Sequence, residues 1–307
     1  MGNTSLYALS VLIWGSTWLA INYQLGVVPL EVSVFYRYAA AAGLMMVFCV
    51  ATRRPLRYGR AEHLMFAGMG LSMFSLNYLM AYGAQLYVSS AINALIFSSV
   101  VWLNILNARL FLGVRADSRI YGASVLGVAG LVVLFWPSLR ETEGSGALLI
   151  GGGMSLIGSL SASLGNVLSQ HAQSRHALPV IQANAWSMSY GAVFNLIIAL
   201  ALGREFLFDP RPAYVLSLIY LVIPGTIIAF GAYLTLVGRI GAHRAGYSVV
   251  MFPVVAVVLA VLFEGLPITP WLLAGMALVL GGNALVLLRP KKVRPPAGAF
   301  SGNENSA

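Results

Sequence analysis

Aromatic and amide side chains are the groups in this sequence whose types and spacing could bind a solute. Phe74, Tyr78 and Tyr82 follow one another at intervals of four residues, with Asn77 beside them. This spacing places the three rings on one face of a helix. Rings can stack on a flat solute, and an amide can exchange hydrogen bonds with its polar groups. The pattern therefore predicts a binding surface of aromatic rings and amides.

Similar side chains recur inside other apolar runs. The predicted solute-binding residues share an aromatic, amide or hydroxyl group: Trp18, Asn77, Tyr78, Tyr82, Asn93, Ser98, Trp102, Asn166, Tyr233 and Tyr247. Polar groups at membrane depth often mark a pathway or a helix contact. An alternative explanation is that some of these rings form interfacial belts or fill packed surfaces. The stripe Gly151, Ser155, Ser159 and Ser163 favours close helix packing instead.

Ionisable groups are missing from the centres of the apolar runs. Arg37 is the only charge inside one, and we expect it to reach toward the surface or to pair with Glu31. Glu31 and Glu264 stand at run ends and are the two carboxylates that could couple transport to protons, although Glu264 could equally end a helix. Without a central titratable group, obligatory proton coupling is not expected.

The same absence argues against an enzyme. The segment GSLSASLG (158–165) offers serines, but a nucleophilic serine needs a base within hydrogen-bond reach. No histidine or lysine lies at that depth, and the sequence has no phosphate-binding G-x-x-x-x-G-K-[ST] loop. We therefore expect no catalytic residues, no metal site and no cofactor.

The composition indicates a membrane protein. Of 307 residues, 59% are hydrophobic and 9% are charged, and the mean hydropathy is +0.83. Soluble domains are about 25% charged. The net charge of +9 could suggest nucleic acid, but the basic residues stand between apolar runs, where they orient membrane spans. The expected partners are the lipid bilayer and a small-molecule substrate, without nucleic acid, and a monomer is favoured.

Apolar runs bounded by charge, proline or glycine predict ten membrane-spanning helices. Their limits are 5–23, 32–52, 64–86, 90–112, 119–137, 146–170, 180–202, 213–237, 245–263 and 270–288. Alternate loops hold fourteen basic residues on one side and three on the other. This bias predicts a multi-pass protein of a bacterial-type inner (plasma) membrane with both termini in the cytoplasm.

A weak internal repeat divides these helices into two sets of five. Residues 91–134 are similar to residues 245–288, so that Gly122 aligns with Gly275. A repeat with an odd number of spans must insert in the opposite orientation, as in many secondary transporters. The predicted fold is an all-α integral membrane protein of ten transmembrane helices in two inverted five-helix repeats. The repeats cover 1–137 and 146–288, joined by an outer loop at 138–145 and followed by a disordered cytoplasmic tail at 289–307.

Three segments resemble a known family. WGSTW (14–18), YRYAAAAGL (36–44) and a closing block with Pro253, Glu264, Gly275 and Gly281–Gly282 resemble the drug/metabolite transporter superfamily of the EamA type. YddG-type exporters of aromatic amino acids are among the similar proteins. The halves depart from strict symmetry, because Ser99 or Val100 stands opposite Pro253, and Leu110 or Phe111 opposite Glu264.

The resemblance implies a secondary transporter that exports amino acids, aromatic ones in particular, or similar small amphipathic metabolites by alternating access. Alternatives are an efflux carrier for drugs or cationic metabolites and a non-transporting membrane receptor. Candidate hinge or gating residues are Pro224, Gly225, Gly238, Gly241 and Pro253. A proline within a helix removes a backbone hydrogen bond, so we expect a bend near Met251–Pro253.

Overall fold

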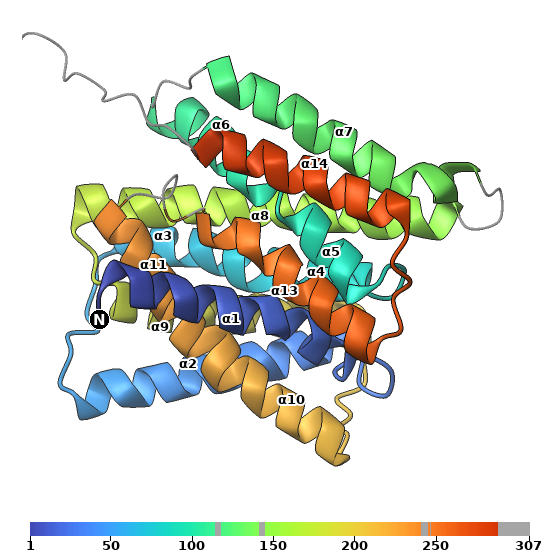
Figure 1. Cartoon of the computed structure of the whole chain (residues 1–307). Helices are drawn as coiled ribbons and strands as arrows, with labels where there is room; N and C mark the ends of the chain where they lie inside the picture. The colour runs from blue at the N-terminus through green and yellow to red at the C-terminus, as the bar shows by residue number, and fades with distance from the viewer. Residues whose placement is uncertain (114–117, 141–144, 241–244, 246, 288–307) are drawn as a thin grey trace, which may run out of the picture.

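The structure, a computed structural model, describes residues 1–113, 118–140, 145–240, 245 and 247–287 (Figure 1). Regular structure in these residues is helical throughout. The helices are α1 (Asn3–Asn22), α2 (Leu30–Ala51), α3 (Arg60–Leu71), α4 (Asn77–Ala84), α5 (Ser90–Phe97), α6 (Val100–Leu112), α7 (Ser118–Arg140), α8 (Ser145–His176), α9 (Val180–Ala201), α10 (Pro212–Val222), α11 (Ala229–Ile240), α13 (Tyr247–Phe263) and α14 (Pro270–Leu287). Two π-helical segments complete the set, η1 (Ser72–Leu76) and η2 (Ile223–Ile228).

In the described part of the chain these segments form ten spans. The third span combines α3, η1 and α4, the fourth combines α5 and α6, and the eighth combines α10, η2 and α11. Each of the ten predicted helices is present, with ends shifted by a few residues. Six helical runs are long and apolar enough to cross a bilayer. Outward-facing leucines such as Leu216 (65% exposed) and Leu262 (68% exposed) suit contact with lipid.

Both third spans of the repeats contain a π-helical segment near their middle, which the sequence analysis did not predict. η1 interrupts the span 60–84, and η2 interrupts the span 212–240. In η2, Pro224 has no backbone N–H to donate, and the Thr226 Oγ1 hydroxyl donates to the Leu221 carbonyl at 2.7 Å. Such π-segments are frequent at functional sites.

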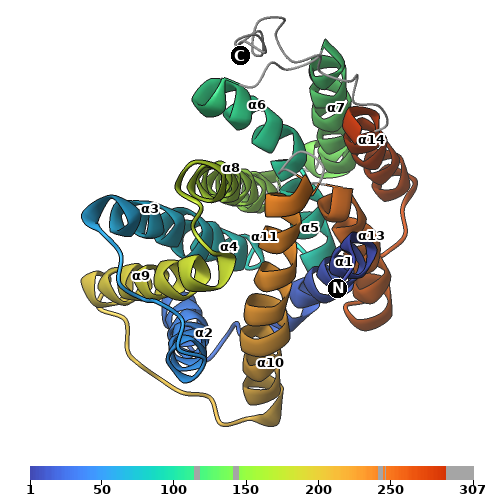
Figure 2. The same cartoon turned by 90° about the vertical axis from the view of Figure 1, so that its left-hand side faces the viewer.

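Counterpart helices of the two halves pack against each other. α7 lies along α14 at one edge of the bundle, and α2 lies along α9 nearer the other edge (Figures 1 and 2). α1 packs on α13 and α11, while α8, its counterpart, packs on α4, α5 and α6. The two halves are therefore inverted five-helix repeats, since α1 and α8 begin at opposite ends of the bundle.

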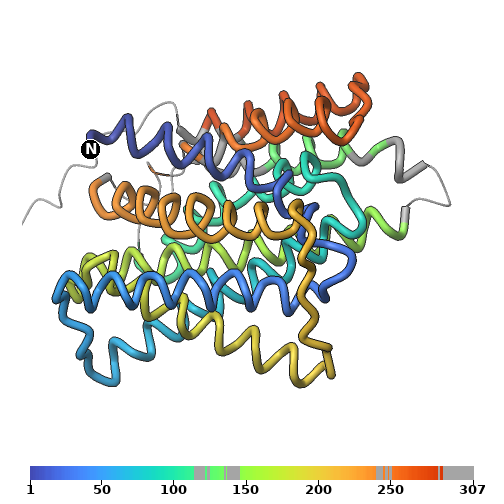
Figure 3. The backbone as a smooth tube through the Cα atoms, turned by 90° about the horizontal axis from the view of Figure 1, so that it is seen from below, coloured from blue at the N-terminus to red at the C-terminus, as the bar shows by residue number. Residues whose placement is uncertain are grey.

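The two ends of the bundle are named here by the chain. The N-terminal side is the end where α1 begins, and the opposite side is the end where α1 finishes at Asn22 (Figure 3). Helix α1 and the helices around it run roughly along a common direction between these sides (Figure 3). The loops 23–29, 85–89, 202–211 and 264–269 all lie on the opposite side.

The fourth spans of the two repeats differ from each other, because one is interrupted and the other is continuous. Between α5 and α6 the helix is interrupted at Ser98–Ser99, and the Ser98 hydroxyl donates to the Leu95 carbonyl at 2.6 Å. Helix α13 continues through Pro253. The interruption thus falls in the half that lacks the proline, and the bend at Met251–Pro253 stays a prediction.

The small-residue stripe of α8 lies in a close helix contact. A Cβ atom on Gly151 would lie 2.9 Å from the Cβ of Tyr87, and the Ser155 hydroxyl donates to the Asn93 carbonyl at 3.2 Å. Ser159 and Ser163 are buried as well. The stripe therefore brings α8 close to the segments around α4 and α5. The predicted tail, 289–307, and residues 141–144 of the predicted outer loop lie outside the described residues.

Candidate functional site: a central cavity between the repeats

A cavity of about 60 Å³ lies among spans of both halves. Binding pockets for small molecules are typically about 300–1,000 Å³, so this cavity must widen to hold a solute of that class. Its wall takes residues from α1, η1, α4, α5, α6, α8, α11 and α13. The aromatic wall residues are Trp14, Trp18, Tyr78, Phe97, Phe230, Tyr233 and Phe252, and the polar ones are Thr17, Asn77 and Asn166. Figure 2 looks along the bundle and shows α1, α5, α8, α11 and α13 around this region.

Trp14 is the centre of the aromatic wall. Its ring centroid lies 4.8 Å from that of Phe230, 5.0 Å from Tyr233 and 5.5 Å from Phe252. The indole Nε1–H donates to the Gly225 carbonyl at 3.0 Å. Because the ring is held by neighbours and a hydrogen bond, it offers a fixed apolar surface to the cavity.

The polar wall residues are tied to nearby atoms but keep some unused capacity. Asn166 Nδ2 donates to Asn104 Oδ1 at 3.3 Å, and Asn77 Nδ2 donates to the Met73 carbonyl at 3.3 Å. In the described part of the chain Asn77 Oδ1 accepts no hydrogen bond. A buried acceptor without a partner is uncommon, so Asn77 could accept a hydrogen bond from a bound solute.

The structure brings five of the ten predicted binding residues together on the cavity wall. They are Trp18, Asn77, Tyr78, Asn166 and Tyr233. Trp18 stacks obliquely on Phe97, with ring centroids 5.2 Å apart. These residues come from α1, α4, α8 and α11, so the cavity joins segments that are far apart in the sequence.

Four other predicted residues lie off the wall. Tyr82 is fully buried and faces Arg37, Asn93 Nδ2 donates to the Ala81 carbonyl at 2.8 Å, and Ser98 bonds within its own helix turn. Trp102 lies beside α7, where its Nε1 would be 3.5 Å from a Cβ on Gly127. The side chain of Tyr247 is outside the described residues.

Sequence reasoning did not select Trp14, Thr17, Phe97, Phe230 and Phe252 as wall residues. For Trp14 a signal existed, because it stands four residues before Trp18 and so shares its helix face. The phenylalanines carry no such signal. A single phenylalanine in an apolar span looks the same whether it faces lipid, a neighbouring helix or a cavity.

The expected environment of Arg37 was wrong. Its side chain is fully buried, so it does not reach the surface, and Glu31 pairs with Arg204 at 3.0 Å instead. Arg204 follows α9, which packs along α2 and brings the two charges together on the opposite side. Glu31 therefore has a cationic partner at a span end, away from the cavity wall.

Glu264 connects three spans on the opposite side. Its carboxylate accepts hydrogen bonds from Asn22 Nδ2 at 3.0 Å, from the Ser90 backbone N–H at 3.3 Å and from the Ser90 hydroxyl. Asn22 ends α1, Ser90 begins α5, and Glu264 follows α13. A negative charge at the start of α5 also suits the helix dipole. The contact joins these helix ends where a gate on this side would open.

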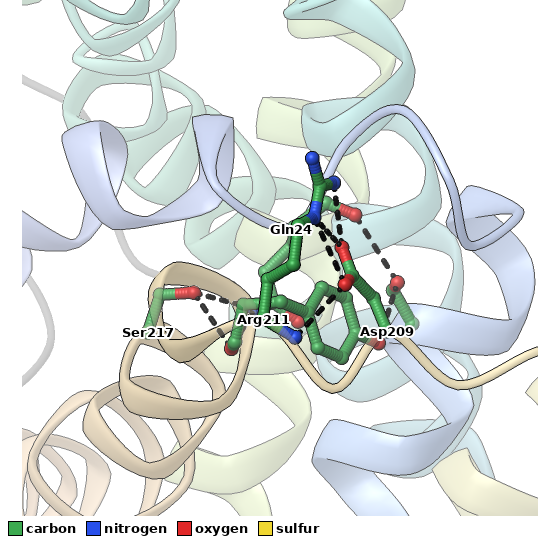
Figure 4. Close-up of polar contacts among 6 residues, drawn as sticks. Gln24, Asp209, Arg211 and Ser217 are labelled. Carbon is green, nitrogen blue, oxygen red and sulfur yellow. Dashed lines mark hydrogen bonds and ion pairs between the residues drawn. The ribbon is translucent and has the colours of Figure 1, made fainter.

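A second polar network orders the opposite side at the α9–α10 loop (Figure 4). Gln24 Nε2 donates to the Ser217 hydroxyl at 2.6 Å and to the Tyr214 carbonyl at 2.9 Å. Arg211 donates from Nε and Nη2 to the Asp209 carboxylate at 2.6 to 2.9 Å. These hydrogen bonds hold the pKa of the Asp209 carboxyl below its usual value.

The candidate hinge residues occupy different places. Pro224 and Gly225 form part of η2, and Gly225 lies against Thr17, whose methyl carbon would be 2.9 Å from an added Cβ. Gly238 faces Gln173 of α8 at a polar recess on the N-terminal side. Gly241 is outside the described residues. The hinge role of these residues stays a prediction.

Ten helical spans in two inverted halves, with a cavity between the halves, form an architecture that recurs in secondary transporters. The family model of the EamA-like transporter family matches residues 4–136 and again residues 148–288. The chain belongs to this family, within the drug/metabolite transporter superfamily. The two matches coincide with the two halves of the bundle.

Several named proteins are similar to this chain. The uncharacterized inner membrane transporter YedA of Escherichia coli strain K12 is 29% identical over 83% of this chain and 80% of that protein. The protein named "Probable amino-acid metabolite efflux pump" of the same strain is 22% identical over 90% and 92% of the two chains. A solved crystal structure has a TM-score of 0.67 at 20% identity, covering 93% of this chain and 96% of that one, which shows the fold. The chain is thus a multi-pass membrane protein of a transporter family.

Proposed function

We propose that this transporter moves amino acids, aromatic ones in particular, or similar small amphipathic metabolites. The observation that carries the proposal is the wall of the central cavity, where seven aromatic rings surround three amide or hydroxyl side chains. Aromatic stacking adds about 0.5–1.5 kcal/mol to simple burial. The relative named as an amino-acid metabolite efflux pump supports the same class of substrate. YddG-type specificity stays a prediction.

The proposed mechanism is alternating access without obligatory proton coupling. The described wall residues include no aspartate, glutamate, histidine or lysine that could carry a proton with the substrate. Glu31 and Glu264 are engaged at span ends on the opposite side. Access would then alternate when the contact of Glu264 with α1 and α5 opens while the N-terminal side closes. Export is proposed from the family resemblance and from the relative named as an efflux pump. Cytoplasmic termini are proposed from the charge bias of the loops.

The experiment is flux from proteoliposomes loaded with radiolabelled phenylalanine, tryptophan or threonine, with and without an imposed pH gradient. We expect rapid flux of phenylalanine and tryptophan, slower flux of threonine, and no requirement for a gradient. Flux that appears only under a pH gradient would contradict uncoupled transport, and Glu31→Gln and Glu264→Gln would identify the responsible carboxylate. The absence of flux for all three amino acids would reject the proposed substrate class.

A second candidate is efflux of cationic metabolites or drugs, because aromatic faces attract cations. The same liposomes distinguish it when loaded with phenethylamine, which keeps the ring and the ammonium of phenylalanine but lacks the carboxylate. Flux of phenethylamine well above that of phenylalanine would favour this alternative.

A further inference from the structure

The buried guanidinium of Arg37 has no role in the function proposed so far. Arg37 is the eighth residue of α2, which places it roughly 10 Å along the helix from the opposite side, at 1.5 Å per residue. Its side chain is 0% exposed. Charged side chains at such depth are unfavourable unless they are compensated, and they commonly mark a substrate or ion site.

The contacts of Arg37 are all with neutral groups. Nε donates to Thr226 Oγ1 at 2.9 Å, Nη1 to the Tyr82 hydroxyl at 3.4 Å and Nη2 to the Gly225 carbonyl at 3.4 Å. The ion pairs of Arg204 with Glu31 and of Arg211 with Asp209 do not include Arg37, and no carboxylate among the described residues pairs with it. A guanidinium has five N–H donors, and two of these three bonds are long. Its charge therefore has no anionic partner among the described residues, and its donor capacity is only partly used.

Only one layer of side chains separates this cation from the cavity. The Arg37 Cζ lies 4.5 Å from the ring centroid of Tyr78, which is itself a wall residue. The Gly225 carbonyl that accepts from Arg37 also accepts from Trp14, a second wall residue. The absence of a side chain at Gly225 lets Thr17 of the wall and Arg37 approach from two sides.

We propose that Arg37 is the binding group for a carboxylate of the substrate, and that Tyr78 covers it when the cavity is empty. Rotation of the Tyr78 ring would open the guanidinium to the cavity, where it could form the paired hydrogen bonds that arginine makes with carboxylates. The ring of an aromatic solute would then stack on the rotated Tyr78 ring, with Trp14 and Phe230 also beside it. The inference rests on the proposed function and specifies it, since it requires a carboxylate and disfavours purely cationic solutes.

The test compares four compounds that share one ring: phenylalanine, 3-phenylpropionate, phenylalaninamide and phenethylamine. Each is used to compete with the flux of radiolabelled phenylalanine in proteoliposomes and, separately, to raise the melting temperature of the purified protein. We expect the two carboxylates to act at concentrations at least about tenfold lower than the amide and the amine. Phenylalanine flux with no preference for the carboxylates would overturn this inference and leave the proposed function standing.

Substitution of Arg37 then locates the preference. Arg37→Gln should lower the preference for carboxylates over the amide and the amine by at least about tenfold. Arg37→Lys should keep part of this preference. Arg211→Gln is the matched control, because it removes one positive charge far from the cavity. A folded Arg37→Gln protein that still prefers carboxylates would reject the assignment. If Arg37→Gln does not fold, the carboxylate preference of Arg37→Lys is compared with that of the unsubstituted protein, and an equal preference would reject the assignment. If none of the four compounds moves or binds, the proposed function itself fails.

Discussion

The second spans of the two repeats occupy counterpart positions and differ in charge. Counted from the first residue of each helix, Arg37 is the eighth residue of α2 and Ser187 is the eighth residue of α9. Both side chains are fully buried, yet only the first is a cation. The halves thus repeat the backbone path without repeating the chemistry, since the buried cation at this position belongs to the first half.

The third spans of the two repeats share a backbone irregularity. Each contains a π-helical segment near its middle, η1 in one half and η2 in the other. Around η2 the freed backbone groups are used, because the Gly225 carbonyl accepts from both Trp14 and Arg37. η1 contributes Met73 to the cavity wall. A shared backbone irregularity therefore serves different contacts in each half.

The largest expected effect concerns two glycines that align in the internal repeat. A Cβ on Gly275 would lie 2.7 Å from the Cβ of Leu134 and 2.9 Å from the Gly130 carbonyl, whereas nothing lies within 4 Å of a Cβ on Gly122. We expect Gly275→Ala to lower the free energy of unfolding by about 1–3 kcal/mol, because it overpacks the contact of α7 with α14.

Thermal unfolding of the detergent-solubilised protein, followed by tryptophan fluorescence, measures this difference. Gly122→Ala is the counterpart in the other repeat, and Gly281→Ala is a control on the same helix with open space around it. Neither control should lower the melting temperature. Equal losses for Gly122→Ala and Gly275→Ala would show that the repeats pack more symmetrically than the structure indicates.

The next effect compares a tyrosine on the cavity wall with one outside it. Tyr78→Ala should weaken phenylalanine affinity about tenfold, a loss of about 1.4 kcal/mol, because a stacking ring is removed. Tyr190 of the second repeat instead bonds His63, with its hydroxyl 3.0 Å from Nδ1. Concentration-dependent flux should show little change for Tyr190→Ala and for Tyr78→Phe. An unchanged affinity in Tyr78→Ala would count against stacking.

A smaller effect separates Glu264 from its counterpart Leu110. Glu264→Ala leaves Asn22 and the Ser90 N–H without their acceptor, which should cost about 1 kcal/mol of stability. Leu110 is 74% exposed, so Leu110→Ala should change little. Melting temperatures of the two variants test the contrast. A melting temperature for Glu264→Ala equal to that of the unsubstituted protein would mean that the contact does not stabilise the opposite side.

The smallest effect is a pH dependence confined to the second repeat. The Asp209 carboxylate is nearly buried and accepts hydrogen bonds from the more exposed Arg211, which lowers its pKa. A depressed pKa in the folded state adds stability above the unfolded value, and that stability is lost as pH falls below about 4 toward the folded value. The melting temperature should therefore fall more steeply with acid in the unsubstituted protein than in Asp209→Asn. If the melting temperatures of the two proteins fall in parallel with pH, Asp209 does not contribute to the loss of stability in acid.

Local patterns predicted the fold well because each span carries its own signal. The apolar runs 90–112 and 270–288 differ from the observed segments 90–112 and 270–287 by at most one residue at either end. The ten predicted binding residues divide between the cavity wall and other positions. Trp18, Asn77, Tyr78, Asn166 and Tyr233 line the cavity, whereas Tyr82, Trp102, Asn93 and Ser98 lie off its wall. Spacing along a helix indicates which residues share a face, but it does not say what that face contacts.

The sequence by itself determined the membrane class, the ten spans, their limits and the division into two halves. These follow from hydropathy, charge and chain parity, which act within one segment or between adjacent ones. The tertiary structure alone decided that Glu31 pairs with Arg204, that Glu264 holds the end of α1 and the start of α5, and that Arg37 is buried behind Tyr78. The rotation of each helix depends on packing against partners that are distant in the sequence, and this rotation determines which polar groups meet.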